Sequence, residues 1–525
     1  MNRETIKNIL NDNPEMKDKL FARGFYFTDS YVDDSKYPFW GLWSKEELGN
    51  YTLLVAPKQR HKVVKDVNCT LILVGHAYNP FQMKSDETDI LVSLQKKMEE
   101  NEDAFFNELN ELTGVFTLIW VKKGNVYVVG DATGMQNTFY TNVNGKVFVA
   151  SHTNLLGDLL NLEWDPYIKR LSKYRFFGLL GNSLPGDLTQ FNEVKRMVPN
   201  HYICFDENKT INVKRFFWPR VQGKSNMEIT KEVSEILHAN MQLIAEKWKK
   251  PAVSMTGGCD SKTTLACVKG LYDKFAYFSY TSSESEDVDA NAAHKICEAL
   301  GLKHTIYRIP QQDSEQTLIE ETRDILLWNT GNLTPINRND VRKRRFFADT
   351  EDFDVEIKSW ASEIGRAYYS KRFNGRKKFG KTPTARVCTT LYKFFLHDRK
   401  LVKDTDHMFT EYLGKYFEQA KMNPIEWQEQ FFWEFRVPSW NGLVITGEHR
   451  YSFDITIPYN NRILLELLVS APIEDRINDT IYSEIRKYMN PVIDETGIAV
   501  TNLKHTKNRE KAENLYYILH SHSWI

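Results

Sequence analysis

A stretch in the middle of the chain alternates between helical and strand patterns, and it constrains the fold more than any other part. An amphipathic helical pattern at 226–249 is followed by a short apolar strand at 252–255. Further strands are expected at 275–280 and 304–309, with a helix at 289–300 before the last strand. Strands that alternate with helices at this spacing pair in parallel through right-handed crossovers. The sequence therefore predicts a parallel sheet covered by helices.

The turn after the first of these strands is the strongest local signal, and it reads Thr256-Gly257-Gly258-Cys259-Asp260-Ser261. Two glycines let the backbone come close to a ligand. The amides and the positive dipole end of the helix that follows favour an anion such as phosphate. The hydroxyls of Thr256 and Ser261 add further donors. A carboxylate at Asp260 beside a polyphosphate is best explained by a Mg²⁺ ion between them.

The spacing of this turn separates it from two other nucleotide motifs. It has neither the Gly-x-x-x-x-Gly-Lys of P-loop enzymes nor the Gly-x-Gly-x-x-Gly of dinucleotide-binding folds. The remaining alternative is a purely structural glycine turn capped by Asp260 and Ser261. The residues predicted to hold the nucleotide are Ser254, Thr256, Gly257, Gly258, Asp260, Ser261 and Ser279.

The first part of the chain has a different character, with short apolar runs separated by turn residues. The pattern predicts strands at 70–75, 114–120 and 126–130, hairpin turns at 122–125 and 142–145, and one helix at 90–110. A chain of 525 residues is too long for one ordinary core. We therefore expect a strand-dominated domain over 1–220 and a second domain over 221–525, whose parallel sheet is followed by a helical extension.

Charge and cysteine usage limit the partners and the compartment. The chain has 69 basic and 69 acidic residues, so no overall attraction to nucleic acid or to a membrane surface is expected. A basic run at 371–381 is interpreted as a solvated loop. The six cysteines include no Cys-x-x-Cys pair, and the start lacks an apolar leader. With no apolar stretch of about 18 residues, the chain is expected in the cytoplasm.

The turn resembles the Ser-Gly-Gly-x-Asp-Ser motif of the ATP pyrophosphatases, with Thr256 in place of the first Ser. Residues 289–304 resemble the acidic-start helix and Leu-Gly-x-x-His turn of the asparagine synthetase family, which includes the β-lactam synthetases. Weaker similarity to the same family is found at 73–79, 114–116, 130–134, 138–140 and 457–462.

The resemblance implies a fold for each half. The N-terminal part is expected to be glutamine-amidotransferase-like, an α+β layered antiparallel sandwich of the Ntn type. The C-terminal part is expected to be an α/β ATP pyrophosphatase domain, with a doubly wound parallel sheet of the adenine nucleotide α-hydrolase type. Glutaminase members of the family begin with a nucleophilic Cys, whereas this chain begins Met1-Asn2-Arg3 and its first cysteine is Cys69. Glutaminase activity is therefore not expected.

The second phosphate loop of the family is also altered. Ser362 stands where the resemblance places a magnesium-binding Asp, and Glu363 keeps the acidic neighbour. Arg366 adds a cation with a forked donor face, suited to phosphate or carboxylate, although an ordinary surface ion pair is an equal alternative. Ile481 replaces a Lys near the C-terminus, which leaves Lys262, Arg366 and Arg486 as candidates to stabilise departing pyrophosphate.

Together these features imply an ATP-dependent carbon–nitrogen ligase that forms AMP and pyrophosphate. Asp260, Glu363 and Arg366 are predicted to be catalytic, with ATP as cofactor and Asp260 and Glu363 as ligands of Mg²⁺. The substrate is expected to be a small molecule or peptide with a carboxylate, and the chain is compatible with a homodimer. Trp328 and Trp360 are candidates to line the acceptor pocket, although buried tryptophans more often belong to cores.

Two alternatives stay open at this point. The same chemistry could amidate a sugar acid or close a ring in a peptide or metabolite. The chain could also be a degenerate nucleotide-binding or scaffold protein, as Met1, Ser362 and Ile481 suggest. The retained glycine turn favours a catalyst.

Overall fold

The computed structural model describes residues 2–175, 177–178, 183–311, 316–331, 336–348, 350–373, 379–393, 398–418, 425–498 and 507–521. Within these residues, two six-stranded antiparallel sheets and one five-stranded parallel sheet form the framework. The strands of the antiparallel sheets all precede residue 216, and those of the parallel sheet follow residue 250. The mixed α/β class is confirmed, and the boundary at residue 220 stays a prediction.

The antiparallel sheets have the strand orders β10-β8-β9-β1-β3-β2 and β12-β11-β7-β6-β5-β4. Their strands are β1 (Phe25–Thr28), β2 (Ser44–Leu48), β3 (Tyr51–Val55), β4 (His61–Lys65), β5 (Cys69–Tyr78), β6 (Thr113–Lys122), β7 (Asn125–Gly130), β8 (Phe139–Val143), β9 (Lys146–Ala150), β10 (Lys195–Arg196), β11 (His201–Phe205) and β12 (Ile211–Arg215). The three strands predicted here lie inside β5, β6 and β7. Both predicted hairpins are confirmed, joining β6 to β7 and β8 to β9.

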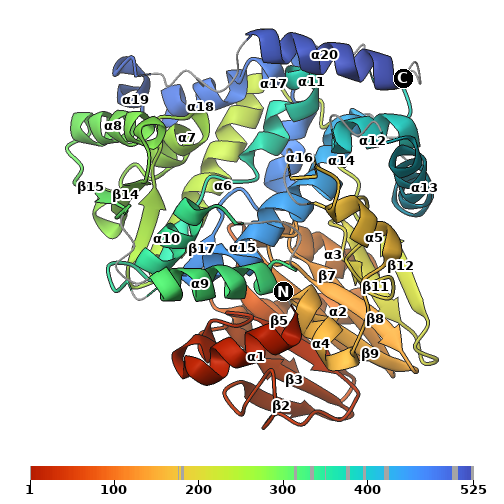
Figure 1. Cartoon of the computed structure of the whole chain (residues 1–525). Helices are drawn as coiled ribbons and strands as arrows, with labels where there is room; N and C mark the ends of the chain where they lie inside the picture. Colours follow the sequence, from red (N-terminus) through yellow and green to blue (C-terminus); the bar gives the residue numbers. More distant parts are fainter. Residues whose placement is uncertain are drawn as a thin grey trace.

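Alternate residues of β5 serve two layers of core, as the side-chain period of a strand requires. Ile72 and Val74 pack with Phe27 of the other antiparallel sheet. Leu71 and Leu73 pack instead under the helices α2 (Glu87–Glu100) and α3 (Glu102–Glu111). The first half of the chain is therefore layered, with two sheets face to face and helices outside the second (Figure 1).

The single helix predicted at 90–110 is wrong. Asn101 has an extended backbone, which ends α2, and its side chain accepts a hydrogen bond from the amide of Ala104 at the start of α3. Asn is a favoured N-cap because its side-chain oxygen satisfies an otherwise unpaired amide. The other helices of this half are α1 (Arg3–Asp12), α4 (Thr153–Leu160) and α5 (Pro166–Ser172).

The parallel sheet has the order β15-β14-β13-β16-β17, and every pair of neighbours is parallel. Its strands are β13 (Pro251–Ser254), β14 (Ala276–Thr281), β15 (His304–Arg308), β16 (Val355–Ile357) and β17 (Asp454–Thr456). The chain adds β14 and β15 on one side of β13 and later adds β16 and β17 on the other. This reversal creates a crevice at the carboxyl end of β13, where open α/β sheets bind ligands.

The helices α6 (Asn226–Lys247), α7 (Cys259–Cys267) and α8 (Glu284–Ala299) accompany this sheet. The predicted strands agree with β13, β14 and β15 to within about one residue, well inside the usual uncertainty of element boundaries. α8 begins at Glu284 rather than at residue 289. Its early start has a consequence for the turn, because it carries Asp289 inside a helix beside Gly257.

A helical region completes the chain, as predicted (Figure 1). Its helices are α9 (Gln316–Asn329), α10 (Arg338–Phe346), α11 (Tyr368–Arg372), α12 (Ala385–Tyr392), α13 (Arg399–Tyr416), α14 (Trp427–Phe431), α15 (Leu443–Gly447), α16 (Arg462–Ser470), α17 (Ile473–Ile477), α18 (Thr480–Met489), α19 (Val492–Glu495) and α20 (Lys507–Ser521). Part of the basic run at 371–381, residues 374–378, lies outside the described residues. None of the described helices combines the length and apolar character that a membrane crossing needs.

The segment at 460–462 joins the antiparallel sheets to the second half of the chain. Arg462 is fully buried and donates hydrogen bonds to the carbonyl oxygens of Gly130 and Asp131. Asn460 donates to the carbonyl oxygen of Gly114 at 2.5 Å. Burial lowers the pKa of Arg462 to about 10. These contacts fix the start of α16 against the ends of β6 and β7.

Candidate functional site

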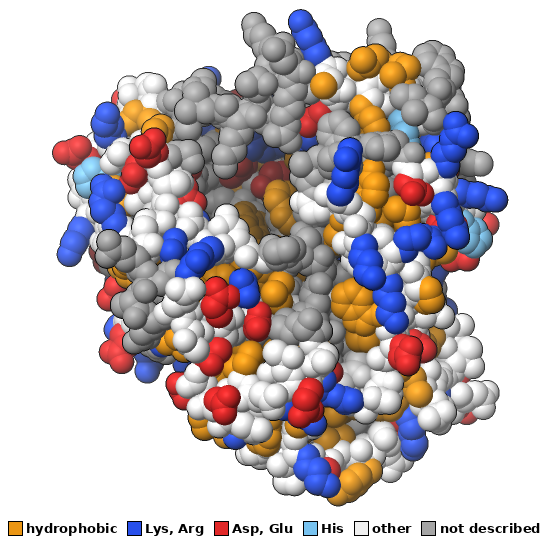
Figure 2. All heavy atoms as spheres, viewed as in Figure 1, with side chains coloured by type: hydrophobic (Ala, Val, Ile, Leu, Met, Phe, Trp, Pro, Cys, Tyr) orange, Lys and Arg blue, Asp and Glu red, His pale blue; other side chains and the backbone are white. Residues whose placement is uncertain are grey.

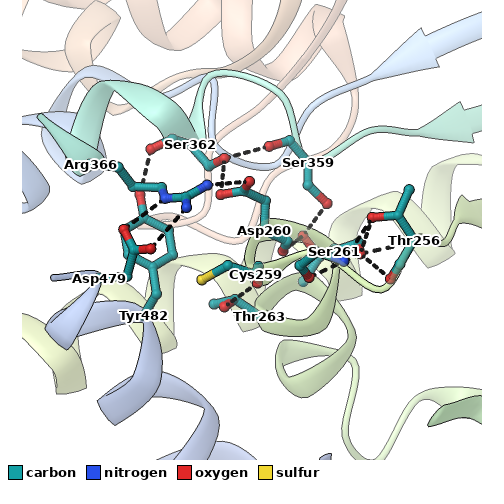
Figure 3. Close-up of polar contacts among 12 residues, drawn as sticks. Thr256, Cys259, Asp260, Ser261, Thr263, Ser359, Ser362, Arg366, Asp479 and Tyr482 are labelled. Carbon is teal, nitrogen blue, oxygen red and sulfur yellow. Dashed lines mark hydrogen bonds and ion pairs between the residues drawn. The ribbon is translucent and has the colours of Figure 1, made fainter. Parts of the chain in front are cut away.

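The predicted phosphate turn connects β13 to α7 at the carboxyl end of the central strand. Thr256 Oγ1 lies 2.9 Å from Ser261 Oγ, which donates to the carbonyl oxygen of Thr256 at 2.7 Å (Figure 3). The two hydroxyls that were expected to contact phosphate therefore bond to each other and to the turn. A phosphate oxygen that binds either hydroxyl has to replace the contact between them.

The glycine amides of the turn also have acceptors. The amide of Gly257 donates to Asp289 Oδ1 at 2.7 Å, and that of Gly258 donates to Thr256 Oγ1 at 3.2 Å. Burial raises the pKa of Asp289, although the bond from Gly257 partly offsets that rise. The first-turn amides of α7, at residues 259–261, have no partner within the helix, as in any α-helix. A phosphate can accept hydrogen bonds from these amides without breaking a hydrogen bond within the helix.

A cleft of about 330 Å³ opens beside the turn, within the usual range of small-molecule sites, about 300–1,000 Å³. It is lined by Ser254, Met255, Thr256, Asp260, Ser261, Ser279, Tyr280, Glu286, Asp289, Ala290, Lys358, Ser359, Trp360 and Glu363. Six predicted site residues are among them. Gly257 and Gly258 belong to the turn itself, and Arg366 lies beside Asp260. Figure 2 shows both signs of charge interspersed over the face it presents, with a hollow in its upper middle.

The two serines predicted at strand ends are brought to the cleft, but their hydroxyls tie strands together. Ser254 Oγ donates to the carbonyl oxygen of Ile357 on β16 at 3.2 Å. Ser279 Oγ donates to the carbonyl oxygen of Met255 at 2.6 Å and lies 3.0 Å from His304 Nε2. These bonds hold the edges of the crevice at a fixed separation.

The loop after β16 brings Ser362 and Arg366 onto Asp260. Ser362 Oγ lies 2.8 Å from Asp260 Oδ1, and Arg366 Nη1 lies 2.6 Å from Asp260 Oδ2 (Figure 3). Both carboxylate oxygens of Asp260 therefore face a donor. The alternative for Arg366 was an ordinary surface ion pair. Arg366 does form an ion pair, but its partner is Asp260, a residue of the predicted site.

Asp479, just before α18, anchors the other side of Arg366. The guanidinium donates to both carboxylate oxygens of Asp479, each at 2.9 Å, and Lys371 Nζ lies 2.8 Å from the same group. Burial favours a higher pKa for Asp479, but the Arg366 and Lys371 cations outweigh it and lower that pKa. Tyr482 Oη donates to the carbonyl oxygen of Ser362 at 2.5 Å, which ties the loop to α18.

Glu363 lines the cleft, and burial together with the nearby Asp260 carboxylate raises its pKa to about 7. A metal ligand has to be deprotonated, and its oxygens have to face the ion. Asp260 has donors on both oxygens, and among the described residues no group of three or more Asp, Glu, His or Cys side chains is arranged to hold a metal. As arranged here, the Asp260 carboxylate is paired with the Arg366 cation and does not fit Mg²⁺ unless Arg366 moves; Glu363 as a metal ligand stays a prediction.

Lys358 was not predicted from the sequence; it directly follows β16, is buried and lines the cleft. Its Nζ lies 2.6 Å from the buried carboxylate of Glu356 and 5.0 Å from the centre of the Trp360 ring. Its position just after a parallel strand could have identified it, because the carboxyl ends of parallel strands meet at one edge of the sheet. Trp360 lines the cleft, and its role in an acceptor pocket stays a prediction, whereas Trp328 is buried elsewhere and donates to Asp158.

The other proposed cations point to a second carboxylate. Arg486 Nε lies 2.8 Å from Asp494, and Lys262 Nζ lies 3.9 Å from the same residue. Arg486 also donates at 3.1 Å to Thr263 Oγ1 in α7, the helix that follows the turn. Ile481 is buried in α18. Of the three candidates named from the sequence, Arg366 is the one that contacts Asp260.

Comparisons with known proteins return no matching family model and no matching curated protein. Among solved structures, the allosteric regulatory enzyme of purine biosynthesis has a TM-score of 0.24 at 10% identity, over 70% of this chain and 74% of that one. Glutamine phosphoribosylpyrophosphate amidotransferase from B. subtilis scores 0.23 at 10% identity, over 79% and 91% of the chains. NH3-dependent NAD synthetase from Campylobacter jejuni scores 0.19 at 14% identity, over 28% and 62%. Scores this low do not establish a shared fold or function.

Proposed function

We propose that this chain binds ATP beside the turn between β13 and α7 and transfers AMP to a carboxylate with release of pyrophosphate. The observation that supports this best is the cleft at the carboxyl ends of β13, β14 and β16, where the strand order reverses. The free amides at the start of α7 supply donors for phosphate, and Lys358 supplies a cation in the lining of the cleft.

The reaction proposed is a substitution at the α-phosphorus. A carboxylate oxygen of the substrate attacks that phosphorus, the bond between the α-phosphorus and the α,β-bridging oxygen breaks, and pyrophosphate leaves with the electron pair of that bond. The nitrogen of an amine then attacks the acyl carbon, and AMP leaves as the amide forms. The protein contributes positioning and charge stabilisation, which is the greater part of catalysis in phosphoryl and nucleotidyl transfer. No step here is assigned to a metal, because the Asp260 carboxylate is already paired with Arg366.

The N-terminal half is proposed to keep an Ntn-type sandwich without glutaminase chemistry, and the parallel sheet to be of the adenine nucleotide α-hydrolase type. Two stacked antiparallel sheets support the first assignment. Cys69 is a poor nucleophile, since burial raises the pKa of its thiol to about 11 and its Sγ lies 3.8 Å from Met98 Sδ. Ammonia or an amine substrate is then the nitrogen source.

One observation favours the second candidate, a nucleotide-free scaffold protein. Hydrogen-bonding groups of the turn already have partners within the protein: Thr256 pairs with Ser261, and the Gly257 amide donates to Asp289. In a scaffold protein these contacts are permanent, whereas in an enzyme ATP displaces them. Calorimetric titration with ATP separates the two functions, because a scaffold protein that binds no nucleotide gives no heat of binding.

The catalytic proposal is tested by incubating the chain with ATP, a panel of carboxylic acids and hydroxylamine, which traps acyl-adenylates. AMP, pyrophosphate and hydroxamate are expected in equal amounts with at least one acid. A matched Ser261→Asp variant, which adds a carboxylate to the cleft, is expected to form none. Formation of ADP and phosphate contradicts the proposal. ATP binding without pyrophosphate release by any acid favours a non-catalytic nucleotide-binding protein.

A further inference from the structure

We infer that the guanidinium of Arg366 takes the place of a divalent cation beside Asp260, so that the triphosphate is bound without a protein-held metal ion. This inference rests on the proposed function, because it concerns how the same site neutralises ATP. It arises from the misfit at Asp260, where a carboxylate expected to face a metal faces a fixed cation instead (Figure 3).

The charges around Asp260 are already balanced by side chains. Two carboxylates, Asp260 and Asp479, lie against two cations, Arg366 and Lys371, at contact distances of 2.6–2.9 Å. Mg²⁺ in nucleotide sites is usually bound by one or two carboxylates, waters and substrate phosphates, so an ion bound to Asp260 here would lie against the positive guanidinium of Arg366. Here Oδ1 of Asp260 faces Ser362 and Oδ2 faces Arg366. A metal can bind this carboxylate only after Arg366 has moved away.

Arg366 is held firmly enough to act as a fixed charge. Its guanidinium makes a forked contact with Asp479, at 2.9 Å for each of two bonds, and a third bond to Asp260. The three side chains are 21–24% exposed, so solvent reaches the group, and Asp260 is the member that lines the cleft. A guanidinium carries five N–H donors and stays charged at all ordinary pH values. Three donors serve the two carboxylates, so two remain for phosphate oxygens.

The backbone around Arg366 is built to place it there. Gly365 passes so close to the neighbouring helices that a Cβ would lie 2.7 Å from Tyr482 Oη and 2.8 Å from Leu468 Cβ. Tyr482 also binds the carbonyl oxygen of Ser362. The loop is therefore pinned on both sides of Glu363, and the side chain that follows Gly365 is directed to Asp260. A neutral hydroxyl at Ser362 completes the contact without adding a second negative charge.

The test is calorimetric titration of the full chain with ATP, once in excess EDTA and once in excess MgCl₂. For the natural sequence, the two dissociation constants are expected to agree within about threefold. Arg366→Met is expected to weaken binding in EDTA by about tenfold or more, with part of the loss recovered in MgCl₂ as Asp260 becomes free. Lys371→Met is the matched control, because it removes one cation from Asp479 without touching Asp260.

The Lys371→Met variant is expected to show the same agreement between EDTA and MgCl₂ as the natural sequence. If Arg366→Met does not fold, Asp260→Asn is used. An Asp that only positions Arg366 can be replaced with little loss of ATP binding in either buffer, whereas a metal ligand cannot be replaced without loss in MgCl₂. Binding by the natural sequence that is about tenfold tighter in MgCl₂ overturns the inference alone. No binding in either buffer overturns the proposed function as well.

Discussion

The carboxylate of Asp289 accepts a hydrogen bond from the amide of Gly257 at 2.7 Å, so the turn proposed to hold a triphosphate already carries a negative group. The contact joins α8 to the β13–α7 turn, and both of these segments contribute residues to the lining of the cleft. It ties the turn to α8. A negative charge here repels an anion at the turn, so under the proposed function we expect Asp289 to weaken ATP binding.

Replacement of Asp289 by Asn is expected to tighten ATP binding. An Asn oxygen can still accept from Gly257, but the negative charge is gone. Two like charges about 5 Å apart repel by roughly 3 kcal/mol at an effective dielectric constant of about 20, and solvent in an open cleft reduces this to about 1 kcal/mol, or fivefold in affinity. Calorimetry measures the change. Asp287→Asn is the control, since Asp287 lies in α8 but pairs with Arg308; equal effects of the two variants contradict the account.

Glu363→Gln is expected to stabilise the chain above neutral pH and to change little at pH 5. Because the folded-state pKa of Glu363 is raised to about 7 from an ordinary 4.5, the natural chain loses stability as pH rises between these values. Below pH 4.5 the carboxyl is protonated in both states and the penalty vanishes. A shift of this size corresponds to about 3 kcal/mol.

Thermal unfolding at pH 5 and pH 8 tests this difference. The melting temperature of Glu363→Gln is expected to exceed that of the natural chain at pH 8, with a smaller gap at pH 5. Glu298→Gln removes an exposed charge on α8 and is expected to show neither effect. A gap that is the same at both pH values contradicts the proposed cause.

The buried pair of Lys358 and Glu356 is expected to behave as one unit. Lys358→Met leaves the Glu356 carboxylate buried without its cation, and breaking such a pair costs about 3–5 kcal/mol. The double variant with Glu356→Gln removes both charges and is expected to recover most of that loss. Urea denaturation of the single and double variants measures the coupling. Additive effects of the two changes contradict a direct interaction.

Gly365→Ala is expected to destabilise the loop that carries Arg366. The new methyl group would meet Tyr482 Oη at 2.7 Å and Leu468 Cβ at 2.8 Å, and overpacking of this kind costs about 1–3 kcal/mol. ATP binding is expected to weaken with it. Gly414→Ala in α13 is the control, because no atom beyond its neighbouring residues and the backbone of its own helix lies within 4 Å of its Cβ position. That change is expected to be neutral or stabilising, since Ala favours a helix over Gly.

The sequence predicted the framework of the fold well, because hydrophobic period and turn chemistry are local. β13, the glycine turn and the strands β5, β6 and β7 were all found from runs of a few residues. The helix at 90–110 was predicted wrongly, because the break depends on one capping side chain, Asn101, in an otherwise continuous helical pattern. A local pattern does not show which of several polar residues will act as a cap.

The site was predicted less completely, because its contacts join residues about a hundred positions apart. The sequence named Asp260, Ser362 and Arg366 separately, but the fact that they contact one another follows from the position of β16 beside β13. Lys358 was missed for the same reason, because a lysine after a strand can be placed in the site only when the neighbouring strands are known. Asp289 was named as part of a helix, and its bond to Gly257 was not foreseen.

The central claim is that the phosphates of ATP lie on the amides at the start of α7. A crystal structure of the full chain grown with ATP tests it most directly. The account predicts phosphate density within hydrogen-bond distance of the amides at residues 259–261, with the Thr256–Ser261 contact opened. Nucleotide density at another place, or an unchanged turn and empty cleft at saturating ATP, would contradict it.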